Sequence, residues 1–383
     1  MLGALSGIRI IDLTRLLPGP FGTTVLADLG AEVIKIESPL EDDWARGLSG
    51  FFASINRGKK SVSLNLKKSA GREIFFRLVK SAEVVAEQFR PGVMDKLGVG
   101  FEQCRRHNPK IVYASLSGYG ADGPYADKAG HDLNYLSLAG IAGVTGTENG
   151  ELAIPGVQVA DQVGGLYLAI AILAGLNQAR TLGQAVKIDV SIFESALSLL
   201  GPHLSEFFRS GKQPGPAGME LNGLLPHYHL YRTSDGRWVS LAALEGKFWA
   251  NFCKAVDRPD WELRLLGGAE EHEKLKREIA ELFASRPLKD WEELISRVPD
   301  LCLEPVRQFS EIANDPHIKA RSALVELERN PGVRVVRSPV RIAGGEDKAS
   351  EPAPSRGADT ERVLEELGYS GEEIARFRRE GAI

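Results

Sequence analysis

The chain has 383 residues, with 47 basic and 51 acidic side chains, a net charge of −4 at pH 7, and 43% hydrophobic residues. This balance is typical of a globular protein with a large core, and the length predicts two domains. The slight acidic excess argues against a general nucleic-acid binder. The longest apolar stretch, residues 166–176, is too short to span a bilayer, so we expect no membrane partner.

The cysteines and the N-terminal residues indicate in which cellular compartment the protein works. Cys104, Cys253 and Cys302 are far apart, which predicts no disulfide framework. Residues 1–4 lack the basic-then-apolar pattern of a signal peptide. We therefore expect a cytoplasmic protein, because thiols stay reduced there.

The first third of the chain alternates between strand-like and helix-like runs. The pattern predicts helices at residues 21–29 and 70–80, a loop at 18–20, and strands at 8–13, 32–37, 61–66, 83–89 and 111–116. Strands that alternate with helices indicate a parallel α/β sheet. Neither G-x-G-x-x-G nor G-x-x-x-x-G-K-[ST] occurs, so the sequence predicts a Rossmann-like fold without a nucleotide motif.

The rest of the chain predicts a second domain and a return to the first. Helices are expected at 161–179 and 191–209 around a strand at 188–190, followed by a linker at 211–226 rich in Gly and Pro. A hairpin (228–233 and 238–242, joined by Asp235-Gly236) and helices up to about residue 313 predict a small α+β domain. A second hairpin (324–328 and 333–342), a loop at 344–357 and a helical tail from 360 follow. We predict a large α/β domain at 1–210 and 321–383, and the small domain at 227–320.

Asp161 is the first candidate for chemistry. It opens the predicted apolar helix, where exposed N–H groups and the helix dipole stabilise a carboxylate. Gly164 and Gly165 lie just inside that helix, where glycine costs stability, and close approach of a backbone or a ligand would explain them. The alternative is that Asp161 is only an N-cap.

His131 and Glu245 are the next candidates. His131 precedes a short apolar helix that ends near Gly140, and a position near a helix start favours the neutral imidazole, which can act as a base. The alternative is a structural histidine bonded to a backbone carbonyl. Glu245 follows the hairpin and is, taken alone, an ordinary first-turn glutamate.

The remaining motifs concern metals and phosphates. His227 and His229 form a His-x-His pair with no third ligand nearby, so we expect no metal site. Basic residues occur in the run 56–60 and at Arg90, which follows a strand at the edge where α/β sheets bind ligands. The alternative for each is a solvated loop charge.

Several short runs of the sequence, taken together, resemble those of the family III CoA-transferases and α-methylacyl-CoA racemases. The resemblance rests on the runs at 5–13, 18–20, 28–37, 56–61, 90–93 and 117–120, and it covers nearly the whole chain. It implies two interlocked chains, with each active site shared between the large domain of one chain and the small domain of the other. It also implies acyl-CoA substrates, with coenzyme A as the carrier and no tightly bound cofactor.

The resemblance assigns roles to residues of this chain. Asp161 matches the catalytic carboxylate, and Arg57, Lys59 and Arg90 match segments that hold the nucleotide end of coenzyme A. His131 matches the second acid/base of the racemases, and Glu245 matches a glutamate that partners that histidine.

Two chemistries remain open. A racemase moves the α-proton between two faces of the substrate, which takes two acid/base groups, His131 and Asp161. A transferase uses Asp161 as a nucleophile on the thioester and needs no second base. The Gly130-His131-Asp132 block favours the racemase, whereas Ser38 and the absence of an asparagine from residues 157–160 favour the transferase. A non-catalytic CoA-binding protein is the third possibility.

Overall fold

The computed structural model describes residues 3–328, 332–342 and 350–383. The chain forms two compact units: unit 1 (Met1–Ile141, Gly156–Pro202 and Pro316–Ile383) and unit 2 (Ala142–Pro155 and His203–Asp315). The segment 142–155 thus belongs to unit 2, as does the stretch 211–226 that the sequence predicts as a linker. Part of the predicted loop at 344–357 lies outside the described residues.

Unit 1 contains a six-stranded parallel sheet. Its order is β3-β2-β1-β4-β5-β6, formed by β1 (Arg9–Leu13), β2 (Glu32–Glu37), β3 (Lys60–Ser63), β4 (Val84–Glu87), β5 (Val112–Ser117) and β6 (Val186–Ser191). The predicted parallel α/β sheet is confirmed. A short antiparallel pair, β10 (Leu324–Glu326) and β11 (Arg334–Val336), forms a separate sheet in the same unit.

Helices cover both faces of the parallel sheet. Successive strand residues alternate between the faces, so that Ile10 belongs to one buried cluster and Ile11 to the other. The first cluster holds residues of α1 (Pro18–Asp28), α6 (Asp132–Ala139), α8 (Val159–Leu182) and α9 (Ile192–Leu199). The second holds residues of α3 (Ser69–Lys80), α5 (Phe101–His107), α16 (Thr360–Glu366) and α17 (Gly371–Arg379).

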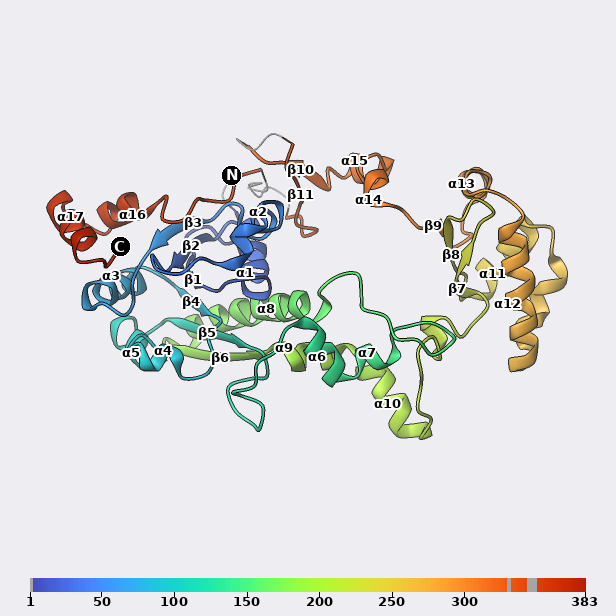
Figure 1. Cartoon of the computed structure of the whole chain (residues 1–383), viewed down its shortest axis with the longest axis horizontal. Coiled ribbons are helices and arrows are strands. Elements are labelled where there is room, and N and C mark those ends of the chain that lie inside the picture. The colour runs from blue at the N-terminus through green and yellow to red at the C-terminus, as the bar shows by residue number, and fades with distance from the viewer. Residues whose placement is uncertain (1–2, 329–331, 343–349) are drawn as a thin grey trace. The chain divides into compact units, whose positions relative to one another are not determined.

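The C-terminal helices return to the outer strand of the sheet. Figure 1 shows α16 and α17 at the β3 side of unit 1. The Thr360 hydroxyl accepts the Ser63 N–H at 3.0 Å, and the Asp359 carboxylate accepts the Ser61 N–H at 2.8 Å. The remaining short helices of unit 1 are η1 (Trp44–Gly47), α2 (Ser49–Asn56), α4 (Val93–Lys96) and α15 (Pro316–Ala320).

The start of one predicted helix and the continuity of another differ from the sequence predictions. Residues 18–20, predicted as a loop, form the first turn of α1, because proline is well suited to the first helical position, where its missing N–H has no partner to lose. The helix predicted at 191–209 is two helices, α9 and α10 (Gly201–Ser210), since Pro202 cannot continue the hydrogen-bond ladder of α9.

The helix α8 is longer than the sequence predicts. It spans 24 residues, and by length and composition alone the whole helix is apolar enough to cross a membrane. The uninterrupted apolar run 166–176 is only the middle part of this helix. Leu168, Ala169 and Ile172 of this helix are buried in the first cluster of unit 1. One stripe of α8 is exposed: Leu166, Ile170 and Leu173 are 42%, 59% and 38% accessible.

Unit 2 is a small α+β body. Its antiparallel sheet has the order β7-β8-β9, with β7 (Tyr228–Arg232), β8 (Trp238–Ala242) and β9 (Leu303–Pro305). The predicted hairpin is confirmed as β7–β8, and β9 is a strand that the sequence analysis missed. The helices are α11 (Gly246–Ala255), η2 (Glu220–Asn222), η3 (Pro259–Leu266), α12 (Ala269–Ala284), α13 (Leu288–Arg297) and α14 (Phe309–Ile312), while α7 (Ile141–Val144) and α10 cross the boundary between the units.

Candidate active site

The strand order creates a natural opening beside β1. Because β2 lies on one side of β1 and β4 on the other, the connections that follow β1 and β4 diverge at their carboxyl ends. Arg15 and Leu16 follow β1, and Arg90 follows β4. All three residues line a pocket of roughly 390 Å³ in unit 1. Arg90 therefore lies beside a pocket at the carboxyl edge of the sheet, and its contact with coenzyme A stays a prediction.

The same pocket contains His131. This residue is the N-cap of α6, and its side chain is exposed. Its backbone N–H donates to the Asn134 side chain at 3.0 Å, which fixes the start of the helix. The predicted short helix ending at Gly140 is confirmed. His131 and Arg90, which lie 41 positions apart in the sequence, share one pocket.

Asp161 is not the N-cap of its helix. The N-cap of α8 is Gln158, and Asp161 lies in the first turn. The Asp161 backbone N–H donates at 3.1 Å to the carboxylate of Asp132, the residue after His131. Asp132 therefore supplies the acceptor that the exposed N–H groups at this end of α8 need. The reading of Asp161 as a simple cap is wrong, and the true capping carboxylate comes from α6.

The proximity of two carboxylates changes the acidity of Asp161. Burial raises its pKa, and the neighbouring negative charge of Asp132 raises it further, to about 7. The pKa of Asp132 is itself raised by burial, although the N–H groups of Asp161 and Ala160 oppose that shift. A carboxyl group that titrates near neutral pH can both accept and return a proton under physiological conditions.

Tyr135 connects Asp161 with the pocket. Its side chain lines the pocket, and burial together with the charge of Asp161 raises its pKa to about 12. The Tyr135 hydroxyl donates to the Gly130 carbonyl at 2.7 Å. A Cβ atom at Gly130 or Gly118 would come within 2.7 Å or 2.5 Å of the Tyr135 ring or hydroxyl, so glycine is required at both positions. Asp161 is thus linked to Asp132 and, through Tyr135, to the pocket that contains His131, but it is not itself a wall residue of that pocket.

Gly165 of α8 serves backbone packing, whereas Gly164 faces the side chain of Ile192. A Cβ atom at Gly165 would lie 2.3 Å from the Pro18 carbonyl oxygen, and one at Gly22 would lie 2.3 Å from the Gly165 carbonyl oxygen. The predicted close approach is therefore that of α1, which crosses α8 at this point. This crossing fixes the N-terminal part of α8, which carries Asp161, against α1.

The two other basic residues assigned to coenzyme A lie inside unit 1. Arg57 is buried and pairs with the Asp28 carboxylate. The Lys59 ammonium group is completely buried and lies 3.1 Å from Asp12 Oδ2. Contact of Arg57 or Lys59 with coenzyme A stays a prediction, and in this structure both cations face protein oxygens.

Glu245 lies in unit 2. It is exposed and forms the N-cap of α11, directly after the β7–β8 hairpin. His229 of β7 lies 3.6 Å from the Glu148 carboxylate, whereas the ring of His227 packs against Trp249. Within the described residues, no group of three or more His, Cys, Asp or Glu side chains is arranged to hold a metal ion.

Sequence reasoning missed Asp132 and Tyr135. Both lie in the run 130–135 that drew attention to His131, and an aspartate immediately before an apolar helical run is a known helix-start signal. That signal places Asp132 at α6 but says nothing of α8, because the contact with Asp161 spans 29 positions.

Comparison with known proteins places the chain in a family. The model of CoA-transferase family III matches residues 5–360, so the chain belongs to this family. The human protein named alpha-methylacyl-CoA racemase is 33% identical over 97% of this chain and 95% of its own length. The acetyl-CoA:oxalate CoA-transferase of Acetobacter aceti is 33% identical over 91% of this chain and 92% of its own.

A solved structure has the same fold. The crystal structure of a CAIB/BAIF family protein from Brucella suis superimposes with a TM-score of 0.81 at 28% identity, covering 96% of this chain and 100% of that one. The mixed α/β fold, with a parallel sheet and a smaller antiparallel one, is thereby supported over the 96% of the chain that this structure covers.

Proposed function

We propose that this protein is an acyl-CoA enzyme that epimerises a 2-methylacyl-CoA by transferring the α-proton. The observation that carries the proposal is the pairing of Asp161 with Asp132, because it gives Asp161 a pKa of about 7 beside a histidine-lined pocket. A pKa near 7 suits a group that must be present in both its ionised and its protonated form within one reaction cycle, as a two-base proton transfer requires.

The proposed reaction has two proton transfers. One of the two bases, Asp161 or His131, removes the proton from C2 of the thioester, and the electron pair moves into the thioester carbonyl to form an enolate. The other group, in its protonated form, then returns a proton to the opposite face of C2, and the carbonyl reforms. The thioester itself stabilises the negative charge, so the step needs no tightly bound cofactor.

The proposed assembly is an interlocked homodimer. The exposed stripe of α8 (Leu166, Ile170 and Leu173) supports it, since apolar side chains spaced four and three residues apart form one continuous helix face. Exposed apolar faces of this kind mark interaction sites on proteins in water. In this dimer Glu245 of one chain would partner His131 of the other, and we propose that the protein works in the cytoplasm.

Wash-in of solvent deuterium tests the proposed reaction. The protein is incubated with a 2-methylacyl-CoA in deuterated water without any acceptor acid, and C2 is followed by mass spectrometry. We expect deuterium at C2 together with formation of the second epimer. No label above a protein-free control would refute proton transfer for that substrate.

CoA transfer is the second candidate. Ser38 favours it, as does similarity to the Acetobacter enzyme whose name states that activity. Asp161 would attack the thioester carbonyl and release CoA as thiolate, leaving a mixed anhydride; the thiolate would then attack the aspartyl carbonyl, release the first acid and leave CoA as a thioester on Asp161. The carboxylate of the acceptor acid would attack this aspartyl thioester and release the CoA thiolate again, and the thiolate would attack the acceptor's carbonyl to form the new acyl-CoA and free Asp161. Hydroxylamine should trap the acyl group on Asp161, and unchanged transfer of labelled CoA by Asp161→Ala would exclude this route.

A further inference from the structure

Four charged side chains are buried beneath the turn that follows β1. Asp12 and Lys59 have fully buried side chains, and those of Lys35 and Asp43 are 1% and 4% exposed. The two positive and two negative charges balance, but burying charges costs free energy even when they are paired. The proposed proton transfer uses none of them, so their place in the fold needs a separate explanation.

Asp12 and Lys59 hold the two ends of the turn. One oxygen of Asp12 accepts the Thr14 N–H at 2.9 Å, and the other lies 3.1 Å from the Lys59 ammonium group. Lys59 also donates to the Pro20 carbonyl at 3.0 Å. The charges of Lys59 and Lys35, with two hydroxyl donors, outweigh burial and lower the pKa of Asp12 to about 2, so it remains an anion.

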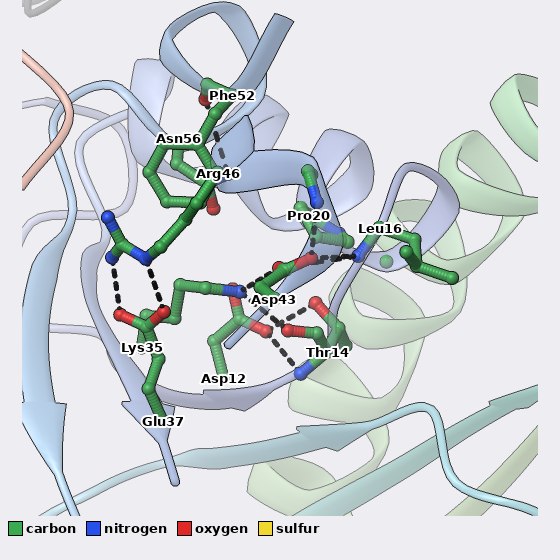
Figure 2. A network of polar contacts seen from close by, with 12 residues as sticks. Asp12, Thr14, Leu16, Pro20, Lys35, Glu37, Asp43, Arg46, Phe52 and Asn56 are labelled. Carbon is green, nitrogen blue, oxygen red and sulfur yellow. Dashed lines mark hydrogen bonds and ion pairs between the residues drawn. The ribbon is translucent and has the colours of Figure 1, made fainter. Parts of the chain in front are cut away.

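Lys35 and Asp43 hold the middle of the turn. The Lys35 ammonium group donates to the Thr14 carbonyl at 2.7 Å and lies 3.3 Å from an oxygen of Asp43. The carboxylate of Asp43 accepts the Leu16 N–H at 3.1 Å. Figure 2 shows Asp43 between Lys35 and the Leu16 backbone, with Asp12 and Thr14 below them.

The conformation at Leu16 explains why the turn needs this support. Its φ of 63° lies in the left-handed region, which costs a branched non-glycine residue free energy unless the surroundings hold it there. The charge-assisted bond from Asp43 to the Leu16 N–H is such a restraint. It determines where Arg15 and Leu16, both wall residues of the His131 pocket, project.

The outer side of the turn rests on the residues that follow β4. The Gly19 N–H donates to the Gln88 side chain at 3.0 Å, and the Arg15 guanidinium lies 5.8 Å from the centre of the Phe89 ring. Gln88 and Phe89 are also wall residues of the pocket. The turn is therefore fixed from below by the buried charges and from the side by the pocket wall itself.

We propose that Asp12, Lys59, Lys35 and Asp43 are positioning residues that hold the turn of residues 14–20, and thereby set the affinity of the His131 pocket for the CoA thioester. The inference rests on the proposed function for the identity of the ligand. It gives Lys59 a role through the fold, as distinct from direct contact with coenzyme A. It also predicts that the network acts on binding and leaves the proton-transfer step at His131 and Asp161 unchanged.

The test compares Asp43→Asn with Asp42→Asn. Both substitutions remove one negative charge from neighbouring residues, but Asp42 is exposed and pairs with Arg356 away from the turn. We expect Asp43→Asn to raise KM for the acyl-CoA about tenfold while kcat changes less than about twofold, the pattern of lost ground-state binding. Asp42→Asn should leave both constants unchanged. An unchanged KM in Asp43→Asn, or a loss confined to kcat, overturns the inference.

Two further measurements separate this inference from the proposed function. If the wild-type protein shows no exchange at C2, the proposed reaction fails, and calorimetric binding of coenzyme A then reports on the turn alone. Asp43→Asn should weaken that binding about tenfold, and equal affinity of the two variants overturns the inference. If Asp43→Asn does not fold by circular dichroism, Asp43→Glu retains the charge opposite Lys35 but displaces the oxygen from Leu16; unchanged KM or CoA affinity in that variant overturns it equally.

Discussion

At the scale of single residues, the site depends on one carboxylate acting on another. Asp132 accepts the N–H of Asp161 and, by its charge, adds to the effect of burial on the acidity of the Asp161 side chain. The helix-start contact and part of the rise in the Asp161 pKa thus come from one residue, Asp132. A proton-transfer site needs a group that titrates near neutral pH, and this arrangement supplies it.

Asp132→Asn should separate the two effects. Asparagine keeps an oxygen that accepts the N–H groups of α8, but it removes the negative charge, so the pKa of Asp161 should fall from about 7. Exchange that uses Asp161 as the base requires its ionised form, and the rise in rate with pH should therefore move to lower pH. The pH profile of deuterium wash-in measures this shift, and Asp122→Asn, in the exposed loop before His131, is the control. A profile that does not move would contradict the coupling.

The raised pKa also predicts a cost in stability. The unfolded chain loses the Asp161 proton near pH 3.8, whereas the folded protein keeps it to about 7, so this residue makes the fold progressively less stable as pH rises between those values. Asp161→Asn removes that cost and should stabilise the protein by about 1–2 kcal/mol at pH 8, and by less at pH 5. Thermal unfolding of the variant and the wild type at the two pH values measures the difference. An equal gain in stability at pH 5 and pH 8 would show that the charge of Asp161 does not destabilise the folded protein.

The sequence indicated part of this site and not the rest. His131, Asp161 and Arg90 were identified from local position and family resemblance, and the structure brings His131 and Arg90 to one pocket. Asp132 was missed, because a contact across 29 positions has no local signature. Lys59 lies in a run that reads as loop charge, yet its ammonium group is buried, because the acceptors around it come from β1, α1 and α2.

At the scale of elements, the N-terminal part of α8 is held by its crossing with α1. The crossing is a backbone contact that only glycine allows on both helices. Gly165→Ala would force the Pro18 carbonyl away and should destabilise the protein by about 2–4 kcal/mol, as overpacking of a rigid contact does. Gly201→Ala, at the open start of α10, meets no atom within 4 Å and should change stability little. Denaturant unfolding of the two variants tests the contact, and equal stability would contradict it.

Element prediction from the sequence worked best where periodicity and end signals agree. β2 and the hairpin strand β8 were predicted at their observed bounds, 32–37 and 238–242. The start of α1 was misplaced because Pro18-Gly19-Pro20 is typical of a loop, although proline also begins helices. The strand β9 was missed because three residues ending in Pro305 carry no recognisable alternation, and pairing with β8 makes them a strand.

At the scale of the whole molecule, the exposed stripe of α8 predicts self-association. Ile170→Glu places a charge in the centre of that stripe and should convert a dimer into a monomer. Burying an unpaired carboxylate in the interface would cost on the order of several kcal/mol of association free energy. Ala280→Glu, on the exposed side of α12, is the control and should leave the mass at two chains. Light scattering after gel filtration gives the mass. A wild-type mass of one chain would contradict the interlocked dimer.

The most direct test of the central claim, that Asp161 and His131 act on opposite faces of one carbon, is stereospecific exchange by two variants. Each pure epimer of a 2-methylacyl-CoA is incubated in deuterated water with His131→Ala or with Asp161→Asn. The account predicts mirror-image results: each variant incorporates deuterium into only one epimer, the two variants prefer opposite epimers, and neither interconverts them. Loss of exchange from both epimers to the same extent in both variants, or unimpaired epimerisation by either one, would contradict a two-base mechanism.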